Sequence, residues 1–162
     1  MSSKLSKVLV VADYFIYKSN QANKKDLTNK KLQKLLYYAQ AWSVALSNKR
    51  LFKENIEAWI HGPAIPSVYK TYKNYGFLPI VKDVDPSEFA DFNAKEKKLL
   101  DSIWQIYGKY DASYLEQLTH NEEPWISARK GMAPFESSNN IISLQNMREY
   151  YLKKLSDTKK GR

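Results

Sequence analysis

The chain has 162 residues, of which 43% are apolar and 14% aromatic, so it can bury the core of one domain and is unlike a disordered chain. Because cysteine is absent, disulfides, thiolate metal sites and cysteine nucleophiles are excluded, and we expect a reducing, cytoplasmic location. No run of about 18 apolar residues predicts a membrane span.

The net charge of +9 is unevenly distributed along the chain. Residues 1–80 contain 13 Lys and Arg against 4 Asp and Glu, whereas residues 81–162 contain 13 of each. This asymmetry is compatible with a solvated lysine surface, a face for an acidic partner protein, or a face for nucleic acid. Composition alone leaves these three interpretations open.

The first predicted element is an amphipathic helix over about residues 4–19, where apolar residues recur at helical spacing. Asp13 interrupts the apolar start of this segment, so we interpret it as a helix and not as a signal peptide. A second helix is predicted from an N-cap at Thr28 to about residue 47.

The second helix is expected to be central, because apolar residues cover most of its sides from Leu35 onward. Its first turns carry Lys30, Lys31 and Lys34, so we expect that end to reach solvent.

Residues 56–60 alternate in polarity and predict a short strand, which the His61-Gly62-Pro63 segment should end. Pro66 is suited to the first turn of a third helix that stops by Gly76. A further short strand is possible over residues 78–81, paired with residues 141–142.

The second half of the chain carries three helix N-cap signals. Asn93 with Glu96 predicts a helix that ends near residue 108, Asp111 predicts one over 112–119, and Ser143 predicts a last one over about 144–155. A single turn is predicted over residues 124–129. The fold class is therefore mainly α: residues 1–155 form one compact domain of about six helices with a small two- or three-stranded sheet, and 156–162 form a basic, flexible tail.

Three stretches of the chain, in order and spacing, resemble the Panacea domain, also described as SocA-like or phage-associated GepA-like. They are residues 27–40 (LTNKKLQKLLYYAQ), 56–69 (IEAWIHGPAIPSVY) and 118–125 (LTHNEEPW). The resemblance covers about residues 5–155. We expect a structural role for the motif residues Thr28, Leu32, Gln33, Leu35, Trp59, His61, Gly62, Pro63, Thr119, His120, Pro124 and Trp125.

The resemblance implies an antitoxin of a toxin–antitoxin module. Members of the family are implied to lie beside unrelated protein toxins, including Fic-type enzymes and toxic alarmone synthetases. One member is a protease adaptor that delivers its toxin for degradation.

The sequence offers no recognisable catalytic, metal or cofactor site. Its two histidines lack the spacing of a metal motif, no serine lies in a GxSxG turn, and no glycine-rich phosphate loop is present. We interpret His61 as a turn residue that donates to a backbone carbonyl, and His120 as a helix C-terminal residue that meets free carbonyls.

The resulting hypothesis is an antitoxin, not an enzyme, that neutralises its toxin by direct binding without a cofactor. The predicted contact residues lie in the basic, aromatic first half: Lys30, Lys31, Lys34, Tyr37, Tyr38, Tyr69 and Tyr72. One alternative is a proteolytic adaptor. Another is a nucleic-acid-binding protein without a toxin partner, in which the aromatic and basic residues 69–73 stack on bases.

Overall fold

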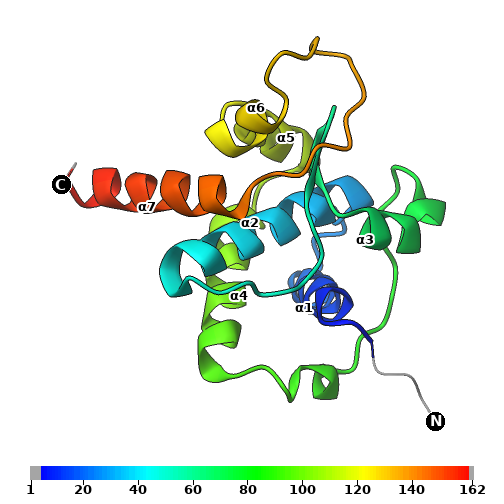
Figure 1. Cartoon of the computed structure of the whole chain (residues 1–162). Helices are drawn as coiled ribbons and strands as arrows, with labels where there is room; N and C mark the ends of the chain where they lie inside the picture. The colour runs from blue at the N-terminus through cyan, green and yellow to red at the C-terminus, as the bar shows by residue number, and fades with distance from the viewer. Residues whose placement is uncertain (1–4, 161–162) are drawn as a thin grey trace.

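The computed structural model describes residues 5–160, which form seven α-helices, two short 3-10 helices and one two-stranded sheet (Figure 1). The mainly-α class predicted from the sequence is confirmed. Residues 1–4 and 161–162 lie outside the described residues. They include the first residue of the first predicted helix and the end of the predicted tail. The elements are α1 (Lys7–Ala22), α2 (Asn29–Ser47), β1 (Glu57–Trp59), β2 (Gly62–Ala64), α3 (Pro66–Thr71), η1 (Lys73–Tyr75), η2 (Pro86–Phe89), α4 (Ala94–Tyr107), α5 (Ala112–His120), α6 (Glu123–Ala128) and α7 (Leu144–Lys160).

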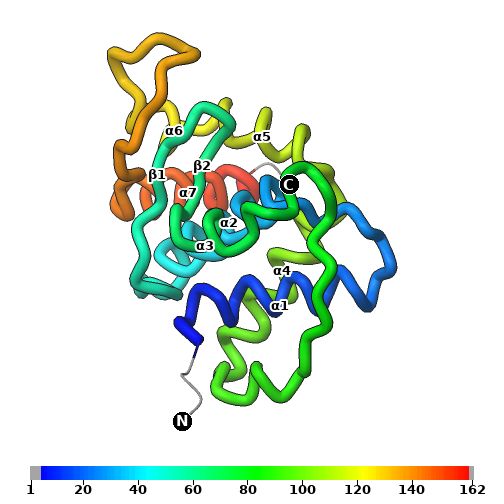
Figure 2. Tube along the Cα trace, turned by 90° about the vertical axis from the view of Figure 1, so that its right-hand side faces the viewer, coloured from blue at the N-terminus to red at the C-terminus, as the bar shows by residue number. Residues whose placement is uncertain are grey.

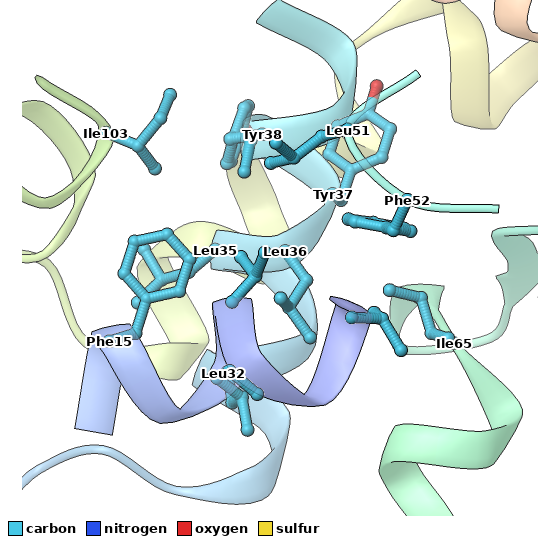
Figure 3. Close-up of a cluster of buried hydrophobic side chains, with 14 of the residues drawn as sticks. Phe15, Leu32, Leu35, Leu36, Tyr37, Tyr38, Leu51, Phe52, Ile65 and Ile103 are labelled. Atoms are coloured by element: carbon cyan, nitrogen blue, oxygen red, sulfur yellow. The ribbon is translucent and has the colours of Figure 1, made fainter. Parts of the chain in front are cut away.

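The central helix of the fold is α2, as the sequence predicts. The Thr28 hydroxyl accepts from the Lys31 amide at 3.2 Å and caps its first turn. Helices α1, α4, α5 and α7 all pack against it (Figure 1). Figure 3 shows side chains from several elements gathered around α2, and Phe15, Leu35 and Ile103 are almost completely buried among them.

The sheet is a tight antiparallel hairpin. Ala58 pairs with Pro63 and Trp59 with Gly62. The first strand ends just before His61-Gly62-Pro63, as the sequence predicts, and Gly62 and Pro63 also begin the returning strand. Gly62 has a φ of 106°, which a residue with a side chain adopts only with strain.

The predicted pairing of residues 141–142 with residues near Ile80 is wrong. The Ile142 amide donates to the Ile56 carbonyl at 2.8 Å, so this segment extends the hairpin on the β1 side. The Ile80 amide instead donates to the Leu27 carbonyl at 2.9 Å. The physical reason is the path of the chain, because α5 and α6 pack beside the hairpin and return the chain to it (Figure 2).

The remaining elements follow the cap signals closely. Asn93 and Glu96 form the predicted capping box, and the Asp111 carboxylate accepts from the Tyr114 amide at 2.8 Å. The last helix continues to Lys160, beyond the predicted end at residue 155. None of the helices between residues 5 and 160 is both long and apolar enough to cross a lipid bilayer.

Candidate functional site

A cleft of about 350 Å³ lies beside the hairpin, and we call it the aromatic cleft. The residues that line it come from the first half of α2, the hairpin, α3, the segment after η1 and the loop between α6 and α7. The residues that line it are Asn29, Lys30, Gln33, Lys34, Trp59, Ile60, His61, Gly62, Ala64, Tyr69, Gly76, Phe77, Ser137, Ser138 and Asn139.

Three aromatic side chains give the cleft its apolar character. The rings of Trp59 and Tyr69 meet edge to face, with centroids 5.1 Å apart. Phe77 stands on the rim with 96% of its surface exposed. Apolar side chains grouped around a cleft, unlike single exposed ones, are typical of a binding surface.

The polar floor of the cleft is a hydrogen-bonded chain that holds α2 to α3 and to the end of the hairpin. Asn29 donates to the Tyr69 carbonyl at 3.0 Å, and Gln33 donates to Asn29 at 2.9 Å. The Gln33 side-chain oxygen in turn accepts from the Ile65 amide at 2.8 Å. These amide groups fix the walls of the cleft, which explains a structural role for the motif residue Gln33.

The loop between α6 and α7 is held in place by the buried Arg129. Its guanidinium donates to the Ala58 carbonyl of β1 at 3.0 Å and to the Glu136 carbonyl of the loop at 2.5 Å. The same guanidinium lies over the Trp125 ring, 5.1 Å from its centroid. Trp125 also donates to the Trp59 carbonyl at 2.8 Å, so the second and third motif stretches meet under the cleft.

Lys34 is the buried cation of the cleft. It is only 2% exposed, and its ammonium donates to the Pro63 carbonyl at 3.1 Å. Burial, and to a lesser extent the neighbouring charge of Lys30, lowers the pKa of Lys34 to about 7. A Cβ on Gly62 would lie 2.6 Å from Lys34 Cε, so the motif glycine makes room for this side chain.

The prediction that Lys31 and Lys34 reach solvent is wrong. Lys31 is completely buried, and its ammonium donates to the Gly108 carbonyl at 2.6 Å and to Asp26 at 2.9 Å. It thus satisfies a free carbonyl at the C-terminal end of α4, where a cation is favoured. Lys30 alone of the three keeps a partly exposed side chain, which pairs with Glu116 of α5.

Three of the four predicted tyrosine contacts are also buried, so these residues do not form a surface in this structure. Tyr38 donates to Glu122 at 3.0 Å, and Tyr151 of α7 donates to the same carboxylate oxygen at 2.8 Å. The hydroxyl oxygens of Tyr151 and Tyr37 lie 3.1 Å apart. Burial raises the pKa of the Glu122 carboxyl. Tyr72 is held against α1 by Asp13 at 3.2 Å, and Tyr69 is the one predicted tyrosine that lines the cleft.

His61 differs from its predicted role, and His120 lies at the predicted helix end, where its ring bonds to the Ile60 backbone. The His61 side chain is 73% exposed, and its Nδ1 lies 3.4 Å from a Glu116 carboxylate oxygen, not against a backbone carbonyl. The ring of His120 also stacks on Trp125 with centroids 4.1 Å apart. Burial lowers the pKa of His120. Between residues 5 and 160 no group of three or more His, Asp or Glu side chains is placed to hold a metal ion.

The remaining motif residues make local structural contacts. Thr119 is fully buried and donates to the Glu116 carbonyl at 2.9 Å, and Pro124 lies in the first turn of α6. Sequence reasoning missed Phe77 and Ser138 as cleft residues. The only available signal was an apolar residue directly after the stop at Gly76, and nothing local places the 137–139 loop beside it.

Comparison with known proteins gives one family. The model of the family described as "Antitoxin SocA-like, Panacea domain" matches residues 32–126, which include most of the cleft-forming elements. No curated protein and no solved structure matches the chain.

Proposed function

Because the chain belongs to the family of SocA-like antitoxins with a Panacea domain, we propose that it neutralises a cognate protein toxin by binding it directly at the aromatic cleft. The family supports the antitoxin role. The structural support for the location is the set of exposed aromatic side chains around a cleft that the family-matched residues build.

The exposed Phe77 beside Trp59 and Tyr69 is the observation that carries this location. Aromatic residues in a concave, preformed site are the usual anchors of protein interfaces. The polar groups between them already bond within the chain, so binding does not leave them unpaired. A stable interface covers roughly 800 Å² on each partner, so the cleft would be its centre and the neighbouring surface its rim.

The proposed mechanism is steric cover of the toxin. The family resemblance makes Fic-type enzymes and toxic alarmone synthetases the candidate toxins. The nucleic-acid alternative is not supported, because Tyr72 of the aromatic and basic segment is buried against Asp13 and its ring does not offer a stacking face.

The test is co-expression with the open reading frame next to the gene. If the two proteins bind stoichiometrically, growth should be rescued, the pair should co-purify, and inhibition of the purified toxin should be complete at about one antitoxin per toxin. Protection at strongly substoichiometric ratios would contradict steric cover. Rescue with loss of the toxin protein from the cells would instead favour the adaptor alternative.

Phe77→Ser provides a variant of the proposed surface, and Phe135→Ser provides the matched control. Both phenylalanines are almost fully exposed, but Phe135 does not line the cleft. Loss of rescue with Phe77→Ser and normal rescue with Phe135→Ser is the expected result. The opposite pattern would place the interface on the loop between α6 and α7.

A further inference from the structure

The aromatic cleft has a cationic end that is incompletely neutralised. Lys30 and Lys34 lie one turn apart on α2, His61 lies on the turn of the hairpin, and all three line the cleft. The anion that faces them is Glu116 of α5, which pairs with Lys30 and lies 3.4 Å from His61 Nδ1.

Lys34 in particular has no carboxylate partner among residues 5–160. An ammonium has three donors, and the one bond found for this group goes to the Pro63 carbonyl at 3.1 Å. The charge of Glu116 raises the pKa of Lys34 without forming an ion pair with it, and the charge of Lys30 lowers that pKa. His120 is also close, and its ring stacks on Trp125. A buried cation without an ion pair is costly, and its lowered pKa reflects that cost. An incoming anion would therefore gain more binding free energy beside Lys34 than beside an exposed lysine.

The rest of the cleft restricts what can carry that anion. The walls beside the cationic end are the apolar rings of Trp59, Tyr69 and Phe77, which suit an aromatic or aliphatic side chain and not a second charge. The surrounding half of the chain, residues 1–80, carries the whole net charge of +9, which favours an acidic partner.

We infer that the cleft binds an acidic and apolar segment of the toxin, with an Asp or Glu carboxylate seated between Lys30 and Lys34 and a neighbouring apolar side chain against Trp59 and Phe77. This inference rests on the proposed function and names the chemistry by which the toxin is recognised. Lys34 then acts as a specificity residue, because a carboxylate gains an ion pair there and an amide of the same shape does not.

The first experiment measures the Kd of the purified toxin from the neighbouring reading frame. Lys34→Met keeps the buried aliphatic stem and removes the charge. Lys30→Gln is a second variant, at the other lysine proposed to contact the carboxylate. Each should raise Kd by about tenfold or more, whereas Lys53→Met, which removes an exposed lysine outside the cleft, should leave Kd unchanged. Circular dichroism is recorded for every variant to check that it is folded. Unchanged Kd for both folded cleft variants would overturn the inference and leave the proposed function intact.

The second experiment does not need the toxin. The full chain is titrated with acetyl-Phe-Glu-amide and with acetyl-Phe-Gln-amide, and binding is followed by the NMR signal of the Trp59 indole. The glutamyl peptide should shift this signal at lower concentration, and Lys34→Met should abolish the difference between the two peptides. Equal effects of both peptides, or a response to inorganic phosphate but not to the glutamyl peptide, would overturn the carboxylate assignment. A clear glutamyl preference in a chain that does not bind the toxin would contradict the proposed function alone.

Discussion

Replacing Lys34 with methionine should remove a pH-dependent part of the stability of the protein. Burial lowers the pKa of this lysine to about 7 in the folded state, against an ordinary value of 10.5. Between these two pH values the unfolded chain holds more protons than the folded one, so the free energy of unfolding increases as pH rises. From pH 7 to pH 9 this single group should add about 2 kcal/mol of stability to the wild type, and the gain should be absent from Lys34→Met.

The assay is urea unfolding of both proteins at the two pH values, followed by circular dichroism. The change in the free energy of unfolding between the two pH values is compared between the two proteins. The contributions of groups that titrate alike in both proteins therefore cancel. Lys53→Met, which removes an exposed ammonium, provides the control and should follow the wild type at both pH values. If Lys34→Met and the wild type gain stability in parallel between pH 7 and pH 9, Lys34 keeps its proton in the folded protein and the reasoning from burial is refuted.

Three further changes test the core, the hairpin and the cleft rim. Leu35→Ala should lower the free energy of unfolding by about 2–5 kcal/mol because the side chain is completely buried on α2, and a urea midpoint close to wild type would contradict that packing. Gly62→Val should lower the stability of the protein far more than His61→Asn does. Gly62 has a φ of 106° and the new Cβ would clash with Lys34, whereas the His61 side chain is mostly exposed. Equal melting temperatures of the two variants would argue against this hairpin geometry. Phe77→Ser should leave the melting temperature unchanged and weaken toxin binding by about tenfold or more, and calorimetric titration that gives an unchanged Kd would place the interface elsewhere.

Local signals in the sequence were sufficient for much of the fold. Thr28, Asn93 and Asp111 cap the helices that they predict, because capping depends only on residues within one turn. The central place of α2 was also predictable, because a helix with apolar residues on most of its sides is usually covered by neighbouring elements.

The candidate site was harder to predict, because burial depends on what packs over a side chain. Lys31 looks like a solvated lysine in the sequence, but the carbonyl that it binds belongs to Gly108, which is 77 positions away. Lys34 is covered by the hairpin in the same way. A natural test of a charged surface is to replace three lysines together with glutamate, here Lys30, Lys31 and Lys34. This variant should unfold, because two of the three new charges would be buried without partners.

The cleft also depends on contacts between distant parts of the chain. Phe77 and Ser138 share it only because residues 140–142 bond to the hairpin and Arg129 holds the intervening loop. No periodicity or cap signal encodes that arrangement, so the sequence predicts a binding protein more readily than it predicts where binding occurs.

The position of α7 has a consequence for how the protein is made. This helix follows all other described elements in the chain, yet its Tyr151 completes the buried cluster of Tyr37, Tyr38 and Glu122 around α2. During translation the aromatic face of α2 therefore emerges from the ribosome long before the segment that covers it. A polypeptide interrupted before residue 144 would display that uncovered face, so chaperones and proteases have a direct means to tell a finished molecule from an unfinished one.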